Sequence, residues 1–178
     1  EISACLVGSE MCIRDSNGVD QEHSDDLLAP AAEKVFEQAD PYIAAMFLKQ
    51  SDPGKSLEIA RRIIADRPET DQNVLWAHNL AGNILLDQGK TDEAIAEYRK
   101  AIELDPRHAW PDNNLGFTLS GQQKTDEAIA EYRKAIELDP SLALPHKNLA
   151  NILREQGKTE EADAEDRKAA ELGAKHPD

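Results

Sequence analysis

Residues 90–106 read KTDEAIAEYRKAIELDP, and the same letters return without a change at residues 124–140. The two copies start at Lys90 and Lys124, so they are offset by 34 residues. A fixed offset of this size is typical of an array of stacked helical repeats, in which each repeat is one supersecondary unit. The repeat therefore has to be interpreted before any single residue.

Each unit is predicted to contain two amphipathic helices. In the copied segment the apolar residues recur at steps of three and four, and they are Ala94, Ile95, Tyr98, Ala101, Ile102 and Leu104. A second helix is indicated upstream by Leu80, Ala81, Ile84 and Leu85, with Gly89 suited to the turn between the two. A pair of helices cannot bury both apolar faces alone, so the units are expected to stack.

The positions of the small and aromatic residues resemble those of tetratricopeptide repeats. The first full unit matches the family at Gly82, Ala94, Tyr98, Ala101 and Pro106, the second at Leu115, Gly116, Ala128, Tyr132, Ala135 and Pro140, and the third at Leu149, Ala150, Ala162 and Ala169. The family's first-helix tryptophan is replaced by His78, Asp112 and His146, and Gln123 stands where Gly89 and Gly157 mark the turn. The resemblance implies an all-α fold, a right-handed α-solenoid of antiparallel helix pairs.

This register divides the chain into six segments. They are 1–16, an artefact or a disordered stretch; 17–36, an acidic lead-in with a short helix; 37–70, a degenerate repeat; 75–108 and 109–142, two repeats; and 143–176, a C-terminal capping repeat. In the degenerate repeat we expect Ile43, Ala44 and Phe47 to face inward. Ser56 and Ile63 occupy its two alanine positions.

The last repeat has lost apolar bulk at three positions. Asp163, Asp166 and Ala170 stand where the second unit has Ile129, Tyr132 and Ile136. In the family these positions face the next repeat, and a terminal repeat needs a polar outer surface to stay soluble. The array is therefore expected to stop here.

The first residues do not follow the repeat pattern. Residues 6–16, and Glu10–Ser16 most clearly, resemble the translation of a sequencing-library transposon end, which points to an artefact joined to a truncated reading frame. The alternative is a genuine short apolar leader. Both cysteines, Cys5 and Cys12, lie here, so they give no guide to disulfides or redox compartment.

Composition narrows the class of function. The formal net charge is -15, whereas nucleic acids and anionic membranes need clustered positive charge, so neither is expected as a partner. No apolar run approaches the length of a membrane span. We expect a soluble protein, cytoplasmic or periplasmic, whose compartment the sequence leaves unknown.

No enzyme, cofactor or metal is predicted. The chain has no nucleophile elbow, phosphate-binding loop or glycine-rich dinucleotide turn. Its five histidines, at positions 23, 78, 108, 146 and 176, lack metal-ligand spacing and are interpreted as surface or helix-start residues. The many carboxylates alternate with Lys and Arg, as on solvated helix faces.

The resemblance implies a concave face formed by the first helix of each pair, and this face is the candidate peptide-binding site. The residues expected there are Trp76, Asn79, Asn83, Trp110, Asn113, Phe117, Lys147, Asn151 and Arg154, together with Leu86 and Leu144. Asparagine can both donate to and accept from a peptide backbone, and aromatic residues dominate binding energy at interfaces. We expect an acidic group of the peptide near Lys147 and Arg154. Alternatively, the tryptophans pack on neighbouring helices and the asparagines are merely solvated.

Some cochaperones with these repeats clamp the carboxylate tails of heat-shock chaperones. Asn83 and Asn114 match the asparagines of that clamp, but Asn79, Leu144 and Asn148 replace its basic residues. The chain is therefore not assigned to that group.

Two classes of function remain open. The first is a protein-interaction module or adaptor whose partner is another protein or peptide. The second is a fragment, either the repeat portion of a larger enzyme or assembly factor or a weakly self-associating array.

The artefact hypothesis makes a direct prediction. If residues 1–16 do not contribute to folding, a chain that starts at Asn17 should melt at the same temperature as the full chain, as followed by circular dichroism. A large drop in the melting temperature would show instead that the segment packs on the repeats.

Overall fold

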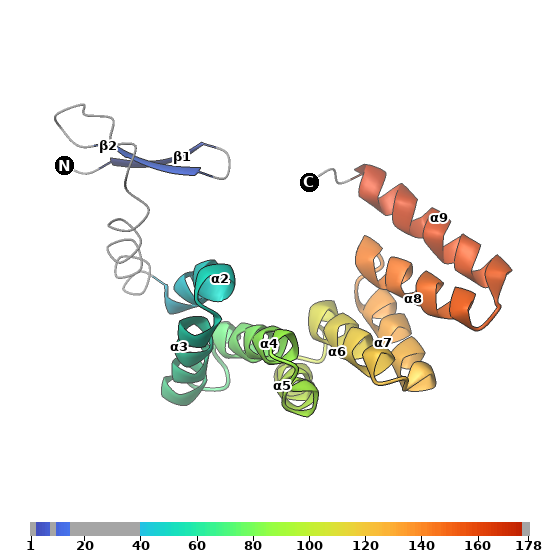
Figure 1. The fold of residues 1–178 in the computed structure, drawn as a ribbon, viewed down its shortest axis with the longest axis horizontal. Helices are drawn as coiled ribbons and strands as arrows, with labels where there is room; N and C mark the ends of the chain where they lie inside the picture. The colour runs from blue at the N-terminus through green and yellow to red at the C-terminus, as the bar shows by residue number, and fades with distance from the viewer. Residues whose placement is uncertain (1–2, 8–9, 15–39, 176–178) are drawn as a thin grey trace. The chain divides into compact units, whose positions relative to one another are not determined.

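The computed structural model describes residues 3–7, 10–14 and 40–175 (Figure 1). The chain divides into two compact units, residues 1–39 and residues 40–178.

The described part of the first unit is a β-hairpin. Strand β1 (Ser3–Val7) pairs antiparallel with β2 (Glu10–Arg14). These strands differ from the artefact or disordered stretch expected at residues 1–16, and their β-branched and apolar residues favour an extended backbone. The origin of the segment stays a prediction, and the short helix expected within residues 17–36 lies outside the described residues.

The second unit confirms the all-α fold. Its helices are α2 (Pro41–Ser51), α3 (Pro53–Asp66), α4 (Gln72–Asp87), α5 (Thr91–Leu104), α6 (Ala109–Gly121), α7 (Thr125–Leu138), α8 (Ala143–Glu155) and α9 (Thr159–Lys175). Each helix packs on the next one along the chain, from α2 to α9 (Figure 1).

The first helices of the pairs form a row of their own. Helix α4 contacts both α2 and α6, and α6 contacts α8, whereas no such contact joins the second helices α3, α5, α7 and α9 to one another. Because the first helices lie closer together, the described array is concave on their side. This row carries the candidate site.

Small residues permit close packing inside each pair. Ala94, Ala101, Ala128 and Ala135 are completely buried, as the repeat register predicts. A Cβ atom added to Gly82 would lie 2.5 Å from the ring of Tyr98. The ring therefore occupies the space that any other residue at position 82 would need.

The degenerate pair α2–α3 corrects one expectation. Ala44 is buried, but Ile43 and Phe47 are about half exposed, at 52% and 53%. Later first helices are covered by the second helix of the preceding pair, and α2 has no such cover within the described residues. At one alanine position, buried Ser56 donates its hydroxyl to the carbonyl of Ala45 at 2.5 Å.

The first-helix tryptophan position holds a titratable residue in all three full repeats. His78 lies 2.6 Å from Glu97, and His146, which is 6% exposed, lies 2.5 Å from Glu165. The interpretation of these two histidines as surface residues is therefore wrong, because they join the two helices of a pair. His108 does stand at a helix start, as the N-cap of α6.

The middle repeat has Asp112 at this position, facing a second carboxylate. Asp112 is fully buried, and Lys134 Nζ lies 2.5 Å from its Oδ1 atom. Burial raises the pKa of Asp112 despite Lys134, and burial followed by the nearby charge of Asp112 raises the pKa of Glu131. This repeat therefore holds a buried negative charge that the other two avoid.

The three turns within the full repeats share a left-handed residue. Gly89 has φ 75°, Gly157 has φ 76°, and Gln123 has φ 61° at the equivalent place. The next amide in each turn bonds back to the helix, for example Lys124 N to Leu119 O at 3.0 Å. Only the middle turn bears a side chain in this strained conformation.

We expect Gln123→Gly to raise the free energy of unfolding by about 0.5–1 kcal/mol, because removing the left-handed strain outweighs the added flexibility of the unfolded chain. The matched control is Gly89→Gln, which should destabilise by a similar amount. A Cβ at Gly89 meets nothing within 4 Å, so sterics do not confuse the comparison. Urea denaturation measures both, and a destabilising Gln123→Gly would contradict the argument.

The buried carboxylate predicts a pH dependence. Because the pKa of folded Asp112 is raised, the native state binds a proton that the unfolded state lacks in the pH window above the ordinary pKa of 3.8. Wild-type stability should therefore rise relative to Asp112→Asn as the pH falls from 7 through this window. Urea titrations of both proteins at several pH values measure the difference.

A double-mutant cycle serves as the control. Lys134→Met should destabilise the wild type at pH 7, because it removes the cation that compensates Asp112, but should matter little in the Asp112→Asn background. Additive effects, or a difference that does not change with pH, would contradict the proposed charge pair.

Candidate functional site

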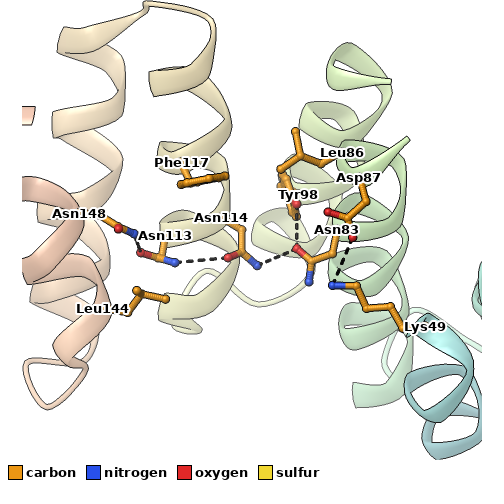
Figure 2. Close-up of a pocket in the computed structure, with 10 residues that line it drawn as sticks. All are labelled: Lys49, Asn83, Leu86, Asp87, Tyr98, Asn113, Asn114, Phe117, Leu144 and Asn148. Atoms are coloured by element: carbon orange, nitrogen blue, oxygen red, sulfur yellow. Dashed lines mark hydrogen bonds and ion pairs between the residues drawn. The ribbon is translucent and has the colours of Figure 1, made fainter. Parts of the chain in front are cut away.

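A groove crosses the row of first helices and encloses about 300 Å³. We call it the amide groove. It is lined by Lys49, Asn83, Leu86, Asp87, Tyr98, Asn113, Asn114, Phe117, Leu144 and Asn148 (Figure 2). These residues come from α2, α4, α5, α6 and α8, so the site exists only when successive repeats stack.

Asparagine side chains form a continuous row of hydrogen bonds along the groove. Asn148 Nδ2 donates to Asn113 Oδ1 at 3.1 Å, and Asn113 Nδ2 donates to Asn114 Oδ1 at 3.3 Å. Asn114 Nδ2 then donates to Asn79 Oδ1 at 3.0 Å and to Asn83 Oδ1 at 3.3 Å. Figure 2 shows the row running from α8 to α4. These contacts fix the amide orientations before any ligand arrives.

A tyrosine connects this row to the core. Tyr98 OH donates to Asn83 Oδ1 at 2.8 Å, while the ring is completely buried between α4 and α5. Burial raises the pKa of Tyr98, so its hydroxyl remains protonated and able to donate. The position of Asn83 thus depends on packing within the first full repeat.

Two of the expected site residues are largely buried within the amide row. Asn79 is 8% exposed and Asn113 is 1% exposed, so they orient neighbouring amides more than they contact solvent. Asn83 and Phe117 line the groove, and Phe117 is 58% exposed. Phe117 and Leu144 lie on either side of the amide row in Figure 2.

The tryptophans behave differently from each other. Trp76 is partly buried and packs edge-on against His108, with ring centroids 4.9 Å apart. Trp110 is 39% exposed. Neither lines the amide groove. Of the two alternatives for the tryptophans, Trp76 therefore fits packing on a neighbouring helix.

The expected cations lie elsewhere. Lys147, Asn151 and Arg154 are exposed but do not line the groove. Arg154 pairs instead with Asp166 of α9 and lies 3.6 Å from Asp163. These carboxylates of α9 therefore neutralise the arginine that was expected to attract an acidic peptide.

Two asparagines that line the groove were not in the predicted peptide-binding set, whereas Leu144, which also lines it, was expected on this face. They are Asn114 and Asn148. The signal was present, because Asn79 and Asn114 are 35 residues apart, as are Asn113 and Asn148. A search at one residue more than the repeat period would have found both pairs.

The charge in the groove is balanced. Its charged residues are Lys49 and Asp87, and these two side chains lie 3.6 Å apart. Within the described part of the chain, no group of three His, Cys, Asp or Glu residues is placed to hold a metal ion. In the same part, no helix is both long enough and apolar enough to cross a membrane.

Comparisons with known proteins agree with this architecture. Residues 82–123 and 119–157 match the family model described as TPR repeat. A crystal structure of MamA is 20% identical, with a TM-score of 0.63 over 88% of this chain and 98% of that chain. The second TPR of Spaghetti (RPAP3), bound to the HSP90 peptide SRMEEVD, is 24% identical, with a TM-score of 0.55 over 58% of this chain and 96% of that chain.

Among curated proteins, no match was found. The structural similarities concern the fold. Together with the family match they show that residues 82–157 carry tetratricopeptide (TPR) repeats within an all-α solenoid of TPR type.

Proposed function

We propose that this chain is a protein-interaction module that holds an extended segment of another protein in the amide groove. The observation that carries the proposal is the amide row flanked by two exposed apolar side chains, Phe117 and Leu144, which are 58% and 42% exposed. Apolar side chains beside ordered amides offer contacts to both the side chains and the backbone of a peptide.

The groove combines two kinds of contact. Asparagine amides pair with the N–H and C=O groups that every peptide backbone carries. Phe117 and Leu144 supply apolar area, which accounts for most of the energy at interface hot spots. The second TPR of Spaghetti (RPAP3), which is similar in fold, is bound to a peptide, and this supports a peptide as the class of ligand.

Lys147 and Arg154 are expected to contribute little to binding in this proposal. Arg154 is held by Asp166 and Asp163, so it has little charge to offer a ligand. Binding through the amide groove should depend mainly on hydrogen bonds and apolar contact. The affinity should therefore depend only weakly on the salt concentration.

The test compares Phe117→Ala with a control at a residue that does not line the groove. Immobilised wild type, Phe117→Ala and Lys100→Ala are used to capture partners from native lysate, and Kd is then measured by calorimetry for the segment mapped in the captured partner. Loss of the phenyl group should weaken binding by about 1 kcal/mol or more. Lys100 is exposed on α5, so Lys100→Ala should bind as the wild type does.

Equal capture by wild type and Phe117→Ala would rule out the groove as the binding site. Circular dichroism of each variant must first show an unchanged helix content. Because Phe117 is more than half exposed, its truncation should leave the fold intact.

A further inference from the structure

The hydrogen bonds of the amide row all point the same way. Each carboxamide nitrogen donates toward α4, from Asn148 to Asn113, from Asn113 to Asn114, and from Asn114 to Asn79 and Asn83. Amide groups in such a chain polarise one another, so the direction is maintained along the row. The row therefore has a donor end and an acceptor end.

The two ends retain unused hydrogen-bonding capacity. At the α8 end, Asn148 Oδ1 accepts no hydrogen bond from any described residue. At the α4 end, Asn83 Oδ1 accepts from Tyr98 and Asn114, whereas Asn83 Nδ2 makes no bond to the described residues. A ligand is thus offered one acceptor at Asn148 and two N–H donors at Asn83.

No net charge accompanies these groups. Lys49 and Asp87 lie 3.6 Å apart and compensate each other, and the other groove residues are neutral. Positions 79, 144 and 148, where the carboxylate clamp described above has basic residues, carry the neutral residues Asn, Leu and Asn. A carboxylate entering this groove would lose hydration without meeting an unpaired cation, and the overall charge of -15 would repel it.

We propose that the amide groove selects an uncharged, internal stretch of an extended partner chain and discriminates against carboxy-terminal and acidic segments. A backbone N–H of the partner donates to Asn148 Oδ1, a backbone C=O accepts from Asn83 Nδ2, and an apolar side chain lies between Phe117 and Leu144. This inference rests on the proposed function and adds to it the polarity and charge of the ligand.

The Asn83→Asp substitution tests the ligand contact of Asn83 separately from its hydrogen bonds within the amide row. An aspartate keeps the oxygen that accepts from Tyr98 and Asn114, but it replaces the free N–H donors with a second oxygen. The variant should fold normally and lose affinity for an uncharged peptide at least about fivefold. The matched control is Asn151→Asp on α8, an exposed asparagine that does not line the groove, which should bind as the wild type does.

The ligand class is tested with two random-peptide display libraries against the full chain. In one library each peptide ends in a free carboxylate, and in the other it is flanked on both sides by Gly-Ser linkers. The flanked library should be enriched, in sequences that have an apolar core and lack Asp and Glu. Synthetic copies should bind with a Kd that changes less than about twofold between low and high salt.

Leu144→Lys should change this selection. Leu144 is 42% exposed, so a lysine can replace it without entering the core. The added cation should improve binding of a copy of the selected peptide with one added Asp, by up to about fivefold at low salt. The wild type should prefer the peptide without Asp.

Enrichment of acidic or free-carboxylate peptides by the wild type overturns this inference, and so does a failure of both libraries. An unchanged Kd for Asn83→Asp overturns the assignment of the donor end. These outcomes differ from failure of the proposed function, which is shown by partner capture that does not depend on Phe117.

Discussion

Contact between a tyrosine ring and a glycine backbone sets the spacing of the helices in the two best-formed repeats. A Cβ atom at Gly82 or Gly116 would lie 2.5 Å or 2.9 Å from the ring of Tyr98 or Tyr132, closer than real contacts allow. Both rings are almost completely buried. In the first full repeat this contact also brings the Tyr98 hydroxyl through the pair to Asn83, so the same interaction that closes the core positions the groove.

The last repeat changes both partners of this contact together. Ala150 replaces the glycine and Asp166 replaces the tyrosine. Ala150 is still completely buried, while Asp166 pairs with Arg154 on the neighbouring helix α8. A methyl group is accommodated because the ring is absent, and an ion pair takes its place. In this repeat the added methyl group and the loss of the tyrosine ring are therefore one coupled exchange.

The sequence was sufficient for the fold because the repeat is copied. Identical letters in α5 and α7 give identical buried alanines and tyrosines, and the fixed offset aligns the first helices with little ambiguity. The groove was harder to predict. A step of one residue rotates a helix position by about 100°, so Lys147 and Asn148 face different surroundings although both fit the repeat. The pairing of His78, Asp112 and His146 with the second helix of each repeat was not predicted, because the sequence does not show which residue such a side chain will contact.

Because the second helices α5 and α7 are identical, differences between these two repeats along the groove arise in the first helices. Position 83 holds an asparagine that accepts from Tyr98, whereas the equivalent position 117 holds a phenylalanine that is 58% exposed. This single difference, beside identical second helices, thus replaces a hydrogen-bond acceptor with an exposed apolar side chain. The helices that build the core can stay fixed while the exposed face of the first helices changes, and the chemistry of the ligand is determined by those few positions.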